Sequence, residues 1–170
     1  MTRVSRSKVD KVFRPPGSEE AATLALQQFR QIFNAVRTHF QQVEKKVGLG
    51  GSQVWALSLV RDFPDIGVGR LAHAMTIHQS TASNLVKILV ERELVVAIKS
   101  ESDRRTVGVR LLPAGRRVLQ RSPQPFAGVL PMALNTLEPK TLKRLNIDLA
   151  TLLEVLQTGE RGANIPLADI

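Results

Sequence analysis

Residues 66–95 read IGVGRLAHAMTIHQSTASNLVKILVERELV, and this stretch decides the fold. It contains two helical patterns of apolar side chains, separated by Thr76, Ile77 and His78. Each helix is expected to bury one apolar stripe: Leu71, Ala72 and Met75 in the first, and Ala82, Leu85, Val86 and Leu89 in the second. Two short helices joined by a tight turn form a helix-turn-helix.

Two β-forming runs follow the helix pair. Residues 94–98 and 106–111 are rich in β-branched side chains and flank the polar stretch 99–105. The sequence therefore predicts a hairpin that serves as a wing beside the helix-turn-helix.

Apolar periodicity predicts helices upstream of this region. Ser18 is expected to cap a long amphipathic helix that ends near Gly48. Ser52 is expected to cap a second helix, which Pro64 closes. The only tryptophan, Trp55, lies in that second helix and is interpreted as a core residue or, alternatively, as a pocket wall.

Prolines shape the prediction downstream of the hairpin. Pro123, Pro125 and Pro131 should divide residues 113–136 into two pieces, because each proline removes a backbone donor and crowds the preceding turn. A last helix is expected from Pro139. It carries an apolar stripe that calls for a partner helix: Leu142, Leu145, Leu149, Leu152 and Leu156.

Composition narrows the partner. Lys and Arg outnumber Asp and Glu by 24 to 15, and the chain has no cysteine. The basic excess favours a polyanionic partner, nucleic acid before a membrane surface. The lack of cysteine excludes disulfides and thiolate chemistry. No run approaches the roughly 18 apolar residues of a membrane span, and the basic N-terminus has no apolar signal-peptide core. We therefore expect a cytoplasmic protein.

Signals for catalysis or metal binding are weak. His39, His73 and His78 are not spaced to align two ligands on one helix face. The glycines at 48, 50 and 51 lack the Lys-Ser/Thr pair of a phosphate-binding loop. No serine lies in a nucleophile elbow. An enzyme, a metal site and a cofactor are therefore not expected.

From about Val54 to Leu119 the chain closely resembles the MarR family of winged-helix transcriptional regulators. The resemblance rests on GVGRLAHAM, STASNLVKILVERELV and SDRRTVGVRLLPAGRRVL. It implies a mainly α fold with a small β-hairpin wing (α+β). The expected organisation is a basic flexible arm or plain solvated tail (1–17), an N-terminal dimerisation helix (18–51), a winged helix-turn-helix lobe (52–112), a kinked linker with dimerisation helices (113–158) and a tail (159–170).

The second helix of the motif offers a polar face for the major groove of DNA. Gln79 and Asn84 have the amide chemistry to read adenine, although family members often have arginine at the position of Asn84. The alternative is a face that is simply solvated. The candidate DNA contacts on this face are His78, Gln79, Ser80, Thr81, Ser83, Asn84 and Lys87.

The wing adds charged candidates. A slender guanidinium suits the narrow, electronegative minor groove, so Arg104 or Arg105 is expected to enter it. By resemblance to the family, Asp103 braces these arginines, and Lys99 is a further candidate contact. A solvated charged turn is the alternative.

The resemblance also implies ligand control. Similar regulators bind small, often aromatic or phenolic anions where dimerisation helices meet the DNA-binding lobe. Trp55 would line that pocket, and Arg37, His39 and Arg61 would supply a polar handle. The leading hypothesis is a homodimeric repressor of a palindromic operator on double-stranded DNA, released by a small aromatic or carboxylate effector. The alternative is a protein-interaction or architectural module that has no specific operator.

Overall fold

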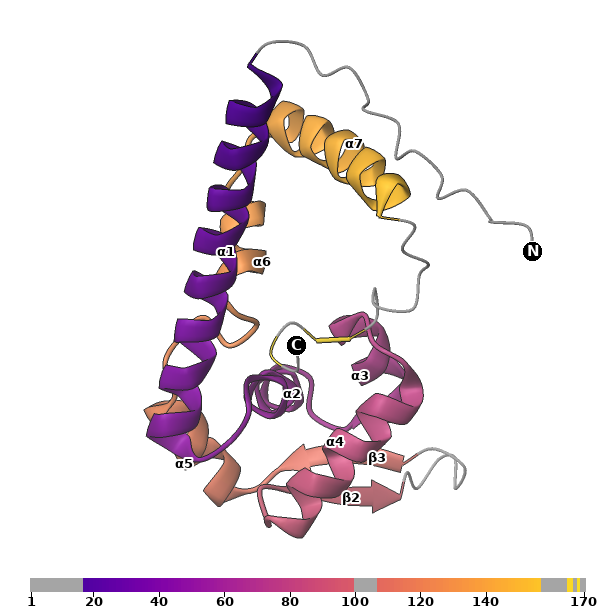
Figure 1. Ribbon diagram of the computed structural model, residues 1–170. Coiled ribbons are helices and arrows are strands. Elements are labelled where there is room, and N and C mark those ends of the chain that lie inside the picture. The colour runs from indigo at the N-terminus through magenta and orange to yellow at the C-terminus, as the bar shows by residue number, and fades with distance from the viewer. Residues whose placement is uncertain (1–16, 100–106, 157–164, 167, 169–170) are drawn as a thin grey trace, which may run out of the picture. The chain divides into compact units, whose positions relative to one another are not determined.

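The computed structural model describes residues 17–99, 107–156, 165, 166 and 168. The chain divides into two compact units, residues 1–33 and 34–170. The first helix, α1 (Ser18–Val47), runs through this division. Its first half is the described part of the first unit, and its second half enters the second unit (Figure 1).

The helix-turn-helix forms as the sequence predicts. It consists of α3 (Val68–Met75) and α4 (Gln79–Glu91), and α2 (Gly51–Asp62) packs against both. Thr76 takes a left-handed conformation, with φ of 55°, and its N–H donates to the carbonyl of His73. This residue ends α3 and turns the chain into α4.

The predicted hairpin is confirmed and gains a third strand. β2 (Val95–Lys99) pairs antiparallel with β3 (Val107–Leu111), with Val95 opposite Leu111. On the other edge of β3 lies β1 (Ile66–Gly67), which gives the order β1-β3-β2. Figure 1 shows α4 passing beside this small sheet. The sequence did not predict β1, because two residues are too few to show an alternating pattern.

The core of the second unit contains the apolar stripes that the sequence predicted for the helix pair. Every residue of the two predicted stripes, from Leu71 to Leu89, is buried. The largest side chains with almost no exposure are Leu57, Leu71, Leu89, Val43, Val54, Val60, Val95 and Val109. Full burial of a side chain of this size contributes roughly 1.5–3 kcal/mol. The lobe thus holds its α2, α3, α4 and sheet around one core.

Two predicted helix caps are wrong. Ser18 is the first residue of α1 rather than its cap, and the N–H of Ala21 donates to the carbonyl of Gly17. α2 begins at Gly51, so Ser52 lies inside the helix. A side chain at Gly51 would collide with the ring of Phe40, which explains why glycine stands there. The start of α2 therefore has no side-chain cap, and glycine at its first position allows close packing against Phe40.

The remaining helices are α5 (Pro113–Arg121), α6 (Val129–Asn135) and α7 (Pro139–Val155). The predicted break between residues 113 and 136 is therefore confirmed. α7 buries none of its residues. In its predicted leucine stripe the first three side chains are half-buried, and Leu152 and Leu156 are exposed. Among the described helices, none is both long and apolar enough to cross a bilayer.

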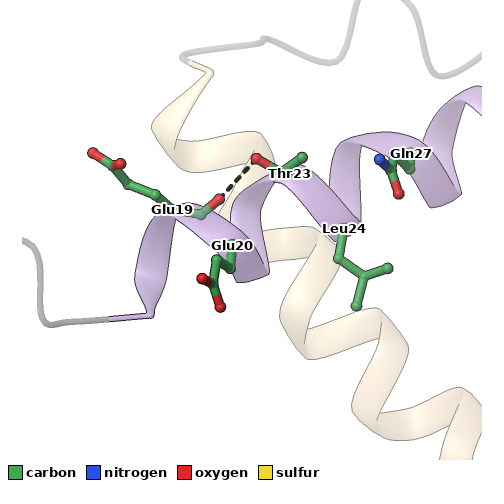
Figure 2. Close-up of a pocket in the computed structure, with 5 residues that line it drawn as sticks. All are labelled: Glu19, Glu20, Thr23, Leu24 and Gln27. Atoms are coloured by element: carbon green, nitrogen blue, oxygen red, sulfur yellow. Dashed lines mark hydrogen bonds between the residues drawn. The ribbon is translucent and has the colours of Figure 1, made fainter.

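The first half of α1 also exposes apolar side chains. Figure 2 shows Leu24 projecting from α1 close to Glu20 and Gln27, and it is 56% exposed. Thr23 donates a hydrogen bond to the carbonyl of Glu19 within the same helix. These side chains line a shallow, open hollow whose described lining belongs to α1 alone, so it is a helix surface and not an enclosed binding site.

Candidate functional site

The apolar and polar faces of α4 are cleanly separated. One face is buried in the core, and the other is open to solvent. The predicted contacts His78, Gln79, Ser80, Ser83, Asn84 and Lys87 are all exposed, whereas Thr81 is half-buried. Ser80, Asn84 and Lys87 recur at steps of four and three, so they form one stripe along the helix.

The side chains of this face are only loosely held. Ser83 donates to the carbonyl of Gln79 at 2.9 Å, which leaves its oxygen as an acceptor. Lys87 Nζ lies 3.9 Å from Glu91 Oε1, and both side chains are well exposed. An exposed pair of this kind holds its lysine weakly. The face therefore keeps donors and acceptors for an external partner.

The start of α4 adds backbone donors. His78 occupies the N-cap position in an extended conformation and makes no side-chain cap bond. The first amides of a helix have no acceptor within the helix. Together with the helix dipole, such amides favour a phosphate.

The tip of the wing lies outside the described residues. This holds for Asp103, Arg104 and Arg105, and the side chain of Lys99 is likewise not described. The described strands on either side, β2 and β3, are paired up to Lys99 opposite Val107.

At the other end of the paired strands lies an ion pair that the sequence analysis missed. Arg110 Nε donates to Asp65 Oδ1 at 2.8 Å, and Arg110 Nη2 donates to Asp65 Oδ2 at 2.5 Å. The hydrogen bonds from Arg110 lower the pKa of the Asp65 carboxyl, and the same bonds raise the pKa of the Arg110 guanidinium. No sequence signal could have paired two residues so far apart, because β1 was not predicted.

Arg70 is a second residue that the sequence analysis missed. It is exposed on α3, the first helix of the motif. In helix-turn-helix proteins the first helix crosses the DNA backbone. The basic character of Arg70 within GVGRLAHAM was the available signal.

A cavity of about 320 Å³ opens beside Trp55 in the second unit. Trp55 is half-buried, packs on the core and lines this cavity. The cavity is mainly apolar, and the described residues that line it include no charged side chain. Its larger lining residues are Phe40, Trp55, Met75, Phe126, Pro131 and Ile165.

The three other predicted pocket residues are not among the described residues of this lining. His39 is buried, and its Nε2 lies 3.0 Å from the carbonyl oxygen of Pro125. Arg61 donates to Asp62 at 2.8 Å, which raises the pKa of Arg61, and its guanidinium lies 5.2 Å from the Phe126 ring centroid. Arg37 is exposed on α1. Of the four predicted pocket residues, Trp55 is the one in the described lining. Arg61 is linked to the cavity indirectly, because its guanidinium lies over the ring of Phe126, which lines it.

The histidines do not form a cluster. His39 is engaged with Pro125, whereas His73 and His78 are exposed on α3 and at the start of α4. Among the residues that the structure describes, no three His, Asp or Glu side chains come together as a metal site.

Comparison with known proteins places this geometry in a family context. Residues 51–107 match the model of the MarR family. The Bacillus subtilis protein described as uncharacterized HTH-type transcriptional regulator YsmB is 28% identical over 91 residues, which is 54% of this chain and 62% of that protein. The match thus spans less than two thirds of that relative.

Solved structures show the same fold. A MarR family transcriptional regulator from Streptomyces coelicolor, in complex with DNA, is similar with a TM-score of 0.55 and 21% identity, covering 89% of this chain and 95% of that one. A MepR-like protein complexed with pseudoligands is similar with a TM-score of 0.53 and 17% identity, covering 84% of this chain and 97% of that one.

Proposed function

We propose that this chain, whose residues 51–107 match the model of the MarR family, is a winged-helix transcriptional regulator that represses transcription by binding a palindromic operator as a homodimer. Members of this family are regulators and not enzymes. The proposal includes the cytoplasmic location that the sequence analysis expects, because the operator would lie on genomic DNA.

The observation that carries the proposal is the two-faced α4. Its apolar side anchors it in the core, while Gln79, Asn84 and Lys87 remain exposed on the other side. A helix presented in this way fits the major groove, where amides can read adenine and a lysine can contact phosphate. The formal net charge of +9 supports the same partner. The Streptomyces coelicolor relative was solved with DNA bound.

The homodimer is supported by apolar surface that one chain leaves uncovered. Phe33 in α1 is 61% exposed, Val155 at the end of α7 is 75% exposed, and Leu156, which caps α7, is 59% exposed. Apolar surface of this kind in a soluble protein marks an interaction site. A two-fold dimer would present two copies of α4 to successive major grooves, about 34–36 Å apart.

The proposal is tested by comparing the affinities for operator and scrambled DNA at several salt concentrations. Operators selected from random duplexes are titrated against scrambled duplexes of equal length from 50 to 200 mM salt. A regulator should prefer its operator by about 10³-fold or more. An architectural module should bind both duplexes alike, with affinity that falls steeply with salt. A ratio near one at every salt concentration would reject operator recognition.

Ligand control is a second part of the proposal, and the cavity beside Trp55 supports it. Its volume and its lining by Phe40, Trp55 and Phe126 suit a small aromatic molecule. The described lining supplies no cation for a carboxylate, so an aromatic effector of low charge fits better than the predicted anion. The MepR-like relative was solved with pseudoligands.

Trp55 provides the readout for this part, because it is the only tryptophan of the chain. Phenols and their carboxylate analogues are titrated while Trp55 fluorescence and operator affinity are followed together. An effector should quench the fluorescence and weaken operator binding by roughly 5- to 150-fold. Quenching with unchanged DNA affinity would indicate a pocket that does not control binding.

A further inference from the structure

The Asp65–Arg110 ion pair joins two parts of the DNA-binding lobe. Asp65 directly precedes β1, and α3 begins directly after β1 at Val68. Arg110 belongs to β3, the strand that returns from the wing. The pair is bidentate, with both carboxylate oxygens bonded to one guanidinium. Two parallel bonds of this kind fix direction as well as distance.

The backbones of Asp65 and Gly108 lie very close together. A Cβ added at Gly108 would lie 2.9 Å from the backbone oxygen of Asp65. Asp65 itself has φ of 61°, a left-handed conformation that aspartate and asparagine tolerate better than most residues. Next to it, β1 pairs with β3, Ile66 opposite Val109 and Gly67 opposite Gly108. Three features therefore hold β3 against the entry to the helix-turn-helix.

We propose that Asp65, Gly108 and Arg110 form a positioning site, the β1 clamp, which sets the direction of the wing relative to α4. The clamp rests on the proposed DNA-binding function. Two contacts at once, α4 in the major groove and the wing in the minor groove, are favourable only if the two elements are held at the right spacing. Without the clamp, DNA binding must also fix the angle of the hairpin, which costs conformational entropy.

The clamp remains formed at neutral pH. The hydrogen bonds from Arg110 lower the pKa of Asp65, so the carboxylate stays ionised well into acid. A lowered carboxyl pKa stabilises the fold above the unfolded value of about 3.9, and this contribution disappears as the pH falls through the folded value. Changes of pH between 5 and 8 should therefore leave the clamp intact.

The replacement Asp65→Asn separates this inference from simple electrostatics. Asparagine keeps the left-handed backbone accessible and removes only the charge. Loss of a negative charge near DNA should strengthen binding if charge alone matters. Loss of the clamp should weaken operator binding by about two- to fivefold, the range for a partly exposed ion pair. The two explanations predict changes of opposite sign.

Asp62→Asn is the matched control. Asp62 is also an exposed aspartate paired with an arginine, Arg61, at 2.8 Å, but it ends α2 and is not bonded to β3. Both replacements change the net charge equally. Asp62→Asn should bind the operator as tightly as the wild type or slightly more tightly.

A measurement without DNA distinguishes failure of the clamp from failure of the proposed operator binding. Hydrogen exchange of the backbone amides in Ile66–Gly67 and Val107–Leu111 should become faster in Asp65→Asn and stay unchanged in Asp62→Asn. If the wild type binds no operator, the proposed function fails, and hydrogen exchange still decides the clamp. Unchanged exchange, together with operator affinity equal to that of Asp62→Asn, would overturn the clamp.

Discussion

The DNA-binding lobe and the two flanking helices use their apolar residues in opposite ways. In the lobe, Leu57, Leu71 and Leu89 are fully buried within a single chain. In the first half of α1 no residue is buried, and the same holds for all of α7. The core of the lobe is completed within one chain, with Val43 of α1 and Leu119 of α5 contributing to it, whereas the first half of α1 and α7 leave apolar side chains exposed.

This difference indicates where each region obtains its stability. Burial within the chain holds the lobe together and leaves one face of α4 at its surface. In our proposal, association covers the exposed part of the α7 stripe, so its contribution to stability depends on protein concentration. The lobe recognises DNA in our proposal, and the helices determine how many lobes act together.

The largest expected effect comes from breaking association. Leu149→Lys with Leu152→Lys places two charges in the leucine stripe of α7 and should produce a monomer. A monomer loses the second half-site, so operator affinity should fall by about 10²- to 10⁴-fold. Sedimentation and DNA titration measure the two effects. Ala150→Lys with Thr151→Lys adds the same charge at exposed positions outside the stripe and should remain dimeric. A dimeric Leu149→Lys, Leu152→Lys variant would remove α7 from the interface.

Within the lobe, the largest expected effect is on folding. Leu57→Ala leaves a cavity in a fully buried site and should lower the free energy of unfolding by about 2–5 kcal/mol. The same replacement at Leu152, which is 38% exposed in one chain, should cost the lobe less. Urea unfolding of both variants, repeated at several protein concentrations, separates the two costs. A concentration-dependent loss in Leu57→Ala would contradict a core that is completed within one chain.

The wing arginines come next in size. Arg104→Ala with Arg105→Ala should weaken operator binding by about 1–3 kcal/mol and leave the fold and the dimer intact. Arg116→Ala with Arg117→Ala removes the same charge from exposed positions of α5 and serves as the control. Equal losses in the two variants would mean that net charge, and not the wing, is responsible.

The regular elements were predictable because their patterns are local. The helical periodicity located α3, α4 and their buried residues, and the prolines located the break before α6. Features that depend on contact between distant residues were not predictable. Gly51 meets Phe40, and Asp65 meets Arg110, only after the chain has folded. His39 was expected in a pocket, but Pro125, which is 86 residues away, provides its partner.

The candidate DNA site follows the same rule. The exposed residues of α4 could be predicted, since a helix that buries one stripe must expose the opposite one. The polar handle of the effector pocket could not. Whether Arg37 or Arg61 reaches a cavity depends on side-chain direction and on competing partners such as Asp62.

The smallest expected effect compares one lysine from each region. Lys87 lies on the exposed stripe of α4, and Lys143 is exposed on α7. If Lys87 contacts phosphate, Lys87→Ala should weaken binding to operator and scrambled duplex alike. Each lost phosphate contact should reduce the slope of log affinity against log salt by about 0.9. Two copies in a dimer would reduce it by nearly two. Lys87 lies 3.9 Å from Glu91 in an exposed, weak ion pair. Breaking this pair on DNA binding should therefore cost little of the affinity gained from the phosphate contact. Lys143→Ala removes the same charge from a helix that we assign to association, and its slope should match the wild type. Equal slopes for both variants would show that DNA affinity depends on the net charge of the whole molecule. In that case, the phosphate contacts could not be assigned to the lobe rather than to the flanking helices.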